Sequence, residues 1–367
     1  MSPPTRRFFR LLSNHIDSFL LVCTMILIAM GLAVLFSASD QSGAKIASQT
    51  INILVACVVM WAVANVPPHQ LLRFALPLYV VGLFLLLGVA FFGEVSNGAR
   101  RWLNLGVARI QPSELMKIAV PMMLAWYFDR HESMLGLKNY AIAAVILVVP
   151  VLLIARQPDL GTAILIASSG FFVLFFAGLD WKIMAGLFVS GLASLPILWS
   201  ILHDYQKQRL LTLIDPSQDP LGAGYHTIQS MIAVGSGGLI GKGWLHGTQA
   251  HLDFLPEHTT DFIFAVFSEE FGLIGNLFLL FMYSLVIARG LSIAANAPTL
   301  FSRLMAGSIT MTLFTYCFVN MGMVSGILPV VGVPLPLVSY GGTSMVTMLL
   351  GFGILMSIHT HKKLVKT

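Results

Sequence analysis

The chain has 367 residues, of which 57% are apolar or aromatic and only 10% are Asp, Glu, Lys or Arg, and its formal net charge is +5. Soluble domains carry about 25% charged residues. This composition excludes a soluble globular domain, a disordered chain and a disulfide-rich secreted scaffold. It indicates an all-α, polytopic integral membrane protein, because lipid offers the backbone no hydrogen-bond partners and each span must therefore be helical.

Runs without charged residues predict ten transmembrane helices in a single membrane domain that covers residues 1–367. We expect the helices at about 17–38, 46–66, 72–93, 112–129, 140–155, 160–178, 183–203, 261–288, 304–326 and 344–360. The fourth is long enough to cross only if it starts near Pro112, which places Glu114 and Lys117 inside the membrane edge. Residues 204–260 form one long loop, and its apolar stretches between glycines predict short interfacial or re-entrant helices.

The distribution of basic residues orients these helices. If the N-terminus is cytoplasmic, the cytoplasmic segments hold 12 Lys and Arg against four acids, whereas the opposite side holds nine bases against 12 acids. The inside then carries +8 and the outside −3, in agreement with the positive-inside rule. Ten spans place both termini in the cytoplasm, and they place the 204–260 loop, between helices 7 and 8, on the outer side.

Three acidic residues lie shortly after a proline at the start of a predicted helix on the outer side: Glu114, Asp159 and Asp261. An acid in the first turn meets the positive end of the helix dipole, so each of them can be a helix cap. Three such groups on one membrane face, with bases nearby, favour a functional site instead. Glu114 and Lys117 are three residues apart, so they share a helix face and can also form a purely structural ion pair.

Two further acids, Glu269 and Glu270, lie roughly 12–13 Å below Asp261 if their helix is continuous. Their side chains point in different directions on a regular helix, so they cannot both face one site. We expect at least one of them to brace another helix or an aqueous cavity.

Several bases accompany the outer acids: Arg100, Arg101, Arg109, Lys117, Arg156, Lys207, Arg209 and Lys242. Such a group suits an anionic lipid head group such as a pyrophosphate, and ordinary interfacial anchoring is the alternative. Residues 235–243 look like a phosphate-binding P-loop, but Ser236 stands where the first Gly is required and Gly243 replaces the Ser or Thr after Lys242. We therefore reject a nucleotide-driven motor.

Five motifs resemble the SEDS family of bacterial morphogenesis and division proteins. They are residues 101–106 (RWLNLG), 111–114 (QPSE) followed by Lys117, 157–162 (QPDLGT), 254–264 (FLPEHTTDFIF) and 336–342 (PLVSYGG). The resemblance runs in order over nearly the whole chain, from about residue 17 to residue 361. Residues 326–334 (GILPVVGVP) resemble the rod-shape branch of the family rather than the cell-division branch.

This resemblance implies a peptidoglycan glycosyltransferase of the bacterial inner membrane that polymerises lipid II on the periplasmic face during cell elongation. It implies a class B penicillin-binding protein and other elongation-complex membrane proteins as partners, and no nucleic acid. Asp261 is then the catalytic carboxylate, and the substrate-binding positions are Arg101, Trp102, Glu114, Lys117, Asp159, Arg209, Lys242, Ser339, Tyr340 and Gly341.

The expected chemistry agrees with the residues. Asp261 is our candidate for the general base that takes the proton of the acceptor hydroxyl, and Arg101, Lys117, Arg209 and Lys242 are candidates for contacts to the departing pyrophosphate. A divalent cation such as Mg²⁺ or Mn²⁺ is compatible with that task, but no local ligand motif calls for one. A lipid II flippase is the main alternative, with Glu269 and Glu270 as its best evidence, and a transporter or a scaffold is a third reading.

Overall fold

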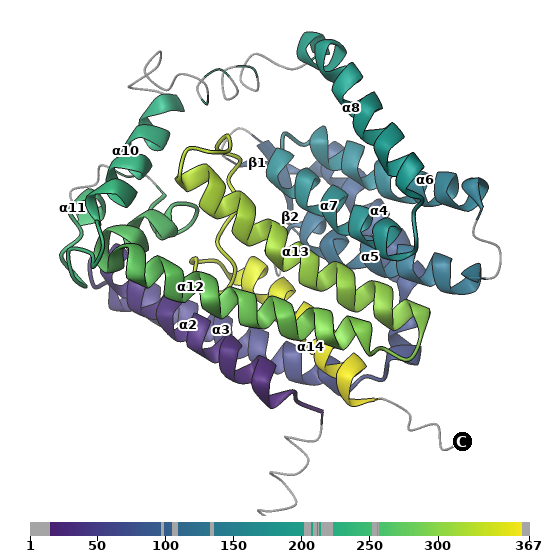
Figure 1. Ribbon diagram of the computed structural model, residues 1–367, viewed down its shortest axis with the longest axis horizontal. Helices are drawn as coiled ribbons and strands as arrows, with labels where there is room; N and C mark the ends of the chain where they lie inside the picture. The colour runs from purple at the N-terminus through teal and green to yellow at the C-terminus, as the bar shows by residue number, and fades with distance from the viewer. Residues whose placement is uncertain are drawn as a thin grey trace, which may run out of the picture.

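Helices make up most of the computed structural model (Figure 1), which describes residues 15–96, 99–104, 109–132, 136–201, 207, 211, 213, 223–251, 255 and 257–361. The elements follow one another as α2 (Ser18–Ala38), α3 (Gly43–Ala64), α4 (Pro68–Phe92), β1 (Glu94–Ser96), β2 (Ala99–Asn104), β3 (Arg109–Ile110), α5 (Pro112–Arg130), α6 (Leu137–Ala155), α7 (Leu160–Phe176), α8 (Trp181–Ile201), α10 (Ala223–Ser236), α11 (Thr248–His251), α12 (Ile263–Ala295), α13 (Leu300–Val324) and α14 (Gly342–Thr360).

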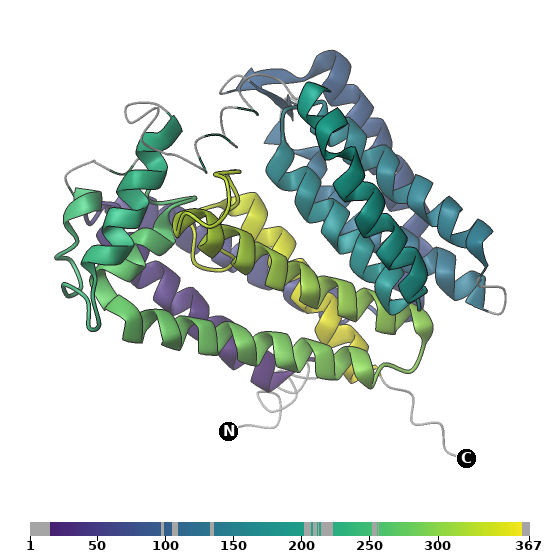
Figure 2. The same ribbon diagram turned by 45° about the horizontal axis from the view of Figure 1, so that its top comes forward.

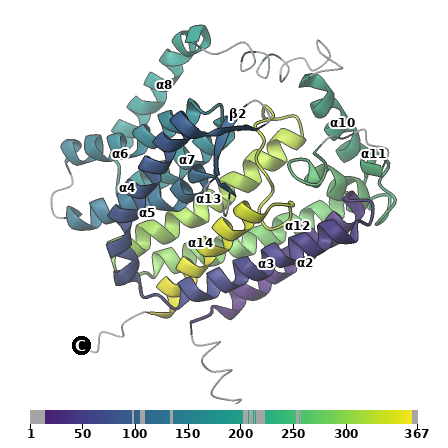
Figure 3. The ribbon, with the colours of Figure 1, turned by 180° about the vertical axis from the view of Figure 1, so that it is seen from behind.

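Seven of the described helices are long and apolar enough to cross a membrane, namely α2, α3, α4, α6, α12, α13 and α14. The prediction of a mostly helical polytopic membrane protein is therefore confirmed. Large apolar side chains such as Phe84 and Phe92 of α4 and Val58 of α3 are exposed on the outside of the bundle, as expected for surfaces that face lipid. Helices α3 and α14 lie side by side (Figure 3).

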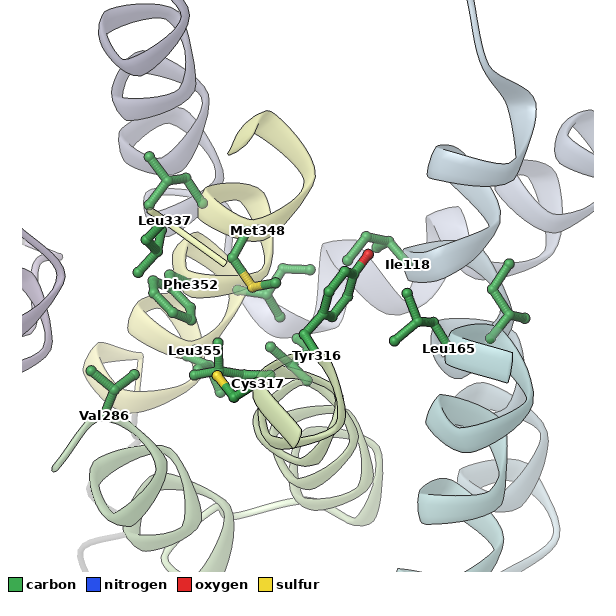
Figure 4. Packing of buried hydrophobic residues seen from close by; sticks show 14 of the residues in the cluster. Ile118, Leu165, Val286, Tyr316, Cys317, Leu337, Met348, Phe352 and Leu355 are labelled. Atoms are coloured by element: carbon green, nitrogen blue, oxygen red, sulfur yellow. The ribbon is translucent and has the colours of Figure 1, made fainter. Parts of the chain in front are cut away.

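Helix α5 lies in the middle of the bundle, where it packs against α4, α6, α7, α13 and α14. Most of its residues are buried, so its charged groups meet protein rather than lipid. Ile118 of α5, Leu165 of α7, Tyr316 of α13 and Met348 of α14 converge in the core beside it (Figure 4). This burial explains why a helix with charges at both ends is stable here.

The all-α prediction is wrong for one segment, because residues 94–110 contain a three-stranded antiparallel sheet in the order β1-β2-β3. Trp102 of β2 pairs with Glu94, and Asn104 pairs with Arg109. The sequence carried a signal for it: Asn97-Gly98 separates β1 from β2, and Asn-Gly between two strands is the strongest local indication of a hairpin. Strands are possible here because the segment connects the end of α4 to the start of α5, beyond the apolar part of α4, where water can satisfy the edge.

Helix α12 is broken, whereas a continuous helix was expected. Gly272 has φ of 63° and ψ of −162°, which interrupts the helix. The glycine-rich segment after α10 occupies the break: Lys242 N–H and Gly243 N–H donate to the carbonyls of Glu269 and Glu270 at 2.9 and 3.0 Å. A Cβ at Gly237 would overlap the carbonyl oxygen of Ser268, so the glycines of the rejected P-loop serve close backbone packing.

The start of α2 and the ends of α12 and α14 meet on one side of the bundle (Figure 2). Asp17 caps α2 by accepting a hydrogen bond from Leu20 N–H at 2.9 Å, and Arg289 of α12 donates to the same carboxylate. His359 Nε2 of α14 lies 3.5 Å from it. Figure 2 also shows that α4, α6, α7 and α8 form one group, which diverges from α2, α12 and α14 toward the top of the view.

Candidate active site

Asp261 lies in the turn that precedes α12, and its carboxylate is not a helix cap. The N-cap of α12 is Phe262, without a side-chain capping bond, and among the described residues the Asp261 carboxylate accepts no hydrogen bond. Burial and the neighbouring carboxylate of Glu257 raise the pKa of Asp261 to about 6, while the charge of Arg101 acts in the opposite direction. A half-buried carboxylate of this kind is ionised at neutral pH and is still basic enough to accept a proton.

Arg101 extends from β2 toward the start of α7. Its Nη2 donates to the carbonyl of Pro158 at 2.7 Å, and its Nε lies 4.0 Å from Oδ2 of Asp159. Asp159 caps α7 by accepting a hydrogen bond from Thr162 N–H at 3.2 Å, so the capping alternative holds for this acid. Gln111 Nε2 donates to the other oxygen of Asp159 at 3.3 Å. These contacts join β2, the start of α7 and the beginning of α5.

Glu114 and Lys117 form the ion pair that their spacing allowed, with 2.6 Å between Lys117 Nζ and Glu114 Oε1. Thr347 of α14 donates to the second Glu114 oxygen at 3.0 Å. Lys117 is buried and lies 5.2 Å from the ring centre of Tyr316. The pair therefore joins α5, α13 and α14.

A groove of about 590 Å³ lies between α3, α4, α5 and α14. Its polar residues gather where α5 and α14 begin: Arg109, Gln111, Glu114, Thr343 and Thr347. Farther along it is apolar, with Phe74 and Leu78 of α4, Met122 of α5, and Leu350 and Ile354 of α14. From Gly342 to Ile354 the groove follows α14 for roughly 18 Å, more than half of the hydrocarbon thickness. Val55 and Phe74 are also exposed, so the groove opens at the outer surface of the bundle.

The motif at residues 339–341 contacts the turn before α12 and helix α3. Ser339 Oγ donates to the carbonyl of Thr260 at 2.6 Å, and Tyr340 N–H donates to the carbonyl of Thr259 at 3.0 Å. Gly341 N–H donates to Gln49 Oε1 at 3.2 Å. All three were predicted to bind substrate, and that role stays a prediction, but their described contacts are within the protein.

Lys242 is engaged away from the Asp261 turn. Its Nζ lies 2.6 Å from Oε1 of Glu269, which is fully buried. The same carboxylate accepts hydrogen bonds from Thr248 N–H at 3.0 Å and from Gln249 N–H at 3.1 Å. Glu269 therefore braces the segment that enters the break in α12, as expected for one deep acid. Lys242 as a pyrophosphate contact stays a prediction, and Arg209 lies outside the described residues.

Glu270, the second deep acid, accepts a hydrogen bond from Ser37 Oγ of α2. A Cβ at Gly247 would lie 3.2 Å from a Glu269 oxygen and 3.3 Å from a Glu270 oxygen. Both carboxylates thus approach the same loop residue, because the helix ends just after them and the loop folds back over both. The prediction that they cannot face one site is wrong for this reason.

Sequence reasoning missed Asn320 of α13, which is fully buried and donates from Nδ2 to the carbonyls of Asp261 at 2.8 Å and Val333 at 2.7 Å. A polar residue inside a long uncharged run was the available signal. Within the described part of the chain, no group of three His, Cys, Asp or Glu side chains is arranged to hold a metal ion.

Comparisons with known proteins cover nearly the whole chain. The family model described as cell cycle protein, of the FtsW, RodA and SpoVE type, matches residues 17–364. The chain is 54% identical to the peptidoglycan glycosyltransferase MrdB of Escherichia coli (strain K12) over 351 residues, 95% of each chain. It is 33% identical to the probable peptidoglycan glycosyltransferase FtsW of Geobacter metallireducens, over 97% of this chain and 98% of that one.

Solved structures share the fold. One chain of a structure on the coordination of polymerization and crosslinking by a peptidoglycan synthase complex matches with a TM-score of 0.82 at 31% identity, over 94% of this chain and 97% of its own length. The rod shape determining protein RodA of Thermus thermophilus matches with a TM-score of 0.71 at 29% identity, over 94% of this chain and 96% of that one.

Proposed function

Because the chain belongs to the FtsW, RodA and SpoVE family of cell cycle proteins and is a peptidoglycan glycosyltransferase, we propose that Asp261 is the general base with which it joins lipid II units into glycan strands. Its greater identity to MrdB than to FtsW, and its similarity to the RodA structure, agree with the resemblance to the rod-shape branch. The observation that carries the proposal is the half-buried carboxylate of Asp261, which accepts no hydrogen bond within the described residues.

In the proposed step, the acceptor hydroxyl oxygen forms a bond to the anomeric carbon of the donor sugar. The bond from that carbon to the pyrophosphate oxygen breaks, and its electron pair leaves with the pyrophosphate. Asp261 takes the hydroxyl proton. Arg101, whose charge acts on Asp261, and Arg109, at the polar end of the groove, are in the best positions to stabilise negative charge on the leaving group. Within the described residues no group of three His, Cys, Asp or Glu side chains is arranged to hold a metal ion, and a divalent cation bound to the pyrophosphate stays a prediction.

The groove is the proposed site for the prenyl chain of a lipid-linked sugar. It combines an apolar trough that opens at the lipid-facing surface with a polar end. A prenyl pyrophosphate likewise has an apolar chain and a charged head. At the polar end Gln111 contacts Asp159, Asp159 lies beside Arg101, and the charge of Arg101 acts on Asp261. This continuity supports a lipid II molecule whose tail lies in the groove and whose sugar reaches the carboxylate.

The flippase alternative loses its main support in the described contacts. A flippase needs polar groups along a path through the bilayer. Glu269 and Glu270 were the only deep acids available for such a path. The Glu269 carboxylate binds the segment that enters the break in α12, and the Glu270 carboxylate accepts a hydrogen bond from Ser37 of α2, so each has a contact within the protein. They leave the transferase as the function that the arrangement supports best.

The number of transmembrane helices and their orientation in the membrane are also part of the proposal. Helices α5, α7 and α8 added to the seven long apolar helices give ten spans, and α2 begins on the side where α14 ends. This agrees with both termini in the cytoplasm, and with α10 and the Asp261 turn at the periplasmic face of the inner membrane. A class B penicillin-binding protein is the proposed partner, because a relative of known structure belongs to a complex that couples polymerization with crosslinking.

Asp261→Asn in the purified full-length protein is the decisive variant. We expect glycan polymer from lipid II to fall about 10²- to 10⁴-fold, the usual contribution of a general base, while the melting temperature stays near that of the wild type. Polymer formation at a normal rate by this variant contradicts the proposed role of Asp261. Movement of labelled lipid II across vesicles by a polymerase-inactive variant would instead favour the flippase.

Two matched variants of α3 test the groove. Val55 lines it, whereas Val58 is equally apolar and exposed but does not line it. We expect Val55→Trp to raise the KM for lipid II and Val58→Trp to leave it unchanged, because only the first ring enters the trough. Equal KM values in the two variants would exclude the groove as the prenyl site.

A further inference from the structure

Three consecutive carbonyls before α12, those of Thr259, Thr260 and Asp261, each accept a hydrogen bond from the C-terminal part of the chain. The donors are Tyr340 N–H at 3.0 Å, Ser339 Oγ at 2.6 Å and Asn320 Nδ2 at 2.8 Å. The turn that presents the carboxylate is therefore held through its backbone by α13 and by the loop before α14.

This arrangement differs from the other acids that precede helices in this chain. Asp17 and Asp159 accept hydrogen bonds from N–H groups of the first helical turn, at 2.9 and 3.2 Å, which occupies their carboxylates. At the start of α12, the carbonyl of Asp261 is held by Asn320 and the carboxylate is left out of the cap. A donor from another helix thus fixes the main chain of Asp261 and leaves its carboxylate available for the reaction.

The burial of the Asn320 amide costs free energy, and its role in holding the Asp261 turn explains why this polar residue is present. It is fully buried, and both hydrogens of its amide nitrogen go to main-chain carbonyls, those of Asp261 and Val333. Its Oδ1 is buried and has no hydrogen-bond partner within the described residues. A buried polar atom without a partner is rare in native proteins and calls for a reason. The double donation to the Asp261 turn and to the loop that carries Ser339 is such a reason.

The loop before α14, which carries Gly332 and Ser339, is also hydrogen-bonded to the donor that holds the turn. Ser339 Oγ also accepts a hydrogen bond from Leu335 N–H at 2.8 Å, so one hydroxyl joins the loop to the turn. Gly332 of this loop has φ of 72°, and a Cβ there would lie 3.3 Å from Oδ2 of Asp261. The loop therefore holds the turn and, through a glycine, keeps the space beside the carboxylate open.

We propose that Asn320 and Ser339 are positioning residues, which hold the main chain of residues 260–261 so that the Asp261 carboxylate stays aimed at the acceptor hydroxyl. This inference rests on the proposed function of Asp261 as the base. A base displaced by about 1 Å loses up to about a hundredfold in rate. Loss of either donor is therefore expected to reduce turnover rather than substrate binding.

Ser339→Ala is the principal test, with Ser339→Thr as the rescue and Ser308→Ala as the matched control. Ser308 of α13 is also a buried serine that donates to a main-chain carbonyl of another segment, that of Ser169 at 2.8 Å, and its described hydrogen bonds do not involve the Asp261 turn. The variants are compared as full-length protein together with the transpeptidase of the same organism. The measurements are kcat and KM for lipid II polymerisation, and melting temperature.

We expect Ser339→Ala to lower kcat about tenfold to a hundredfold with KM within about twofold of the wild type. Ser339→Thr keeps the hydroxyl and is expected to retain most of the activity, and Ser308→Ala is expected to lower the melting temperature without a comparable loss of kcat. Asn320→Leu removes both N–H groups of the side-chain amide. If this variant folds, we expect its kcat to fall as that of Ser339→Ala does.

A kcat of Ser339→Ala equal to that of Ser308→Ala overturns the proposal, as does a loss confined to KM. Asp261→Asn in the same assay separates the two hypotheses. If Asp261→Asn remains active, the role of the base is wrong. If it is inactive while Ser339→Ala is fully active, only the positioning role is wrong.

Discussion

Asp261 is expected to set the lower pH limit of the polymerisation reaction. With a pKa of about 6 the carboxylate is about one-tenth ionised at pH 5, so kcat/KM there should be about a tenth of its plateau value. An Asp with the ordinary pKa of 3.8 would still be about nine-tenths ionised at pH 5 and would show almost no loss. The two cases differ by nearly tenfold at a single pH.

Two neutralising substitutions should move this limit in opposite directions. Glu257 raises the pKa of Asp261, so Glu257→Gln should shift the acidic midpoint to lower pH. Arg101 lowers that pKa, so Arg101→Gln should shift the midpoint to higher pH. A shift of half a unit changes the rate at pH 5 by about threefold, which initial rates can resolve.

The assay is the initial rate of glycan formation from lipid II between pH 4.5 and 8 at constant ionic strength, with melting temperature recorded at each pH. A carboxyl whose pKa is higher in the folded than in the unfolded protein binds more protons when folded. Between pH 6 and pH 3.8, Asp261 therefore stabilises the fold as the pH falls, and its titration cannot cause unfolding there. A wild-type midpoint near 4, or a midpoint that neither substitution moves, refutes the reasoning.

Two further predictions concern the break in α12. Lys242→Ala leaves the fully buried Glu269 without its cation and should destabilise the protein by about 3 kcal/mol, measured as a lower melting temperature. Lys242→Arg keeps the charge and should have only a small effect on the melting temperature. Normal stability of Lys242→Ala with weakened lipid II binding would instead make Lys242 a substrate contact. Gly237→Ala places a Cβ against the Ser268 carbonyl and should cost about 1–3 kcal/mol or more, while Gly235→Ala, with nothing within 4 Å of the new Cβ, should not. Equal melting temperatures for the two alanine variants would show that the break is not tightly packed.

The helices were the most predictable part of the fold, because a span needs a long run without charges and such runs are visible in the sequence. The expected segment at 140–155 corresponds to α6 (Leu137–Ala155), and that at 344–360 corresponds to α14 (Gly342–Thr360). The break in α12 was not predictable in this way. Gly272 alone does not end a helix, and the contacts that hold it open come from residues 237–243, some 30 positions earlier.

The acids that the sequence places at helix starts show the same limit for the prediction of the site. Asp159 and Asp261 both lie close to a proline at a helix start, so local sequence gives each the same two interpretations. The structure separates them: Asp159 caps its own helix, and Asp261 does not. The turn before α12 is held instead by distant donors, Asn320, which lies 59 residues after Asp261, and Ser339, which lies 79 residues after Thr260, and no local pattern contains that information.

These contacts together fix the short helical segment 263–271 at both ends. Asn320 and Ser339 hold the turn at its beginning, and the glycine-rich segment holds its end through the carbonyls of Glu269 and Glu270. A transporter needs its polar site to change accessibility as one part of the bundle moves against another. A transferase gains from the opposite property, because a base already in place requires no reorganisation when the proton moves. The fixed position of Asp261 is therefore a reason, independent of the family, to regard this face as a site of chemistry rather than a gate.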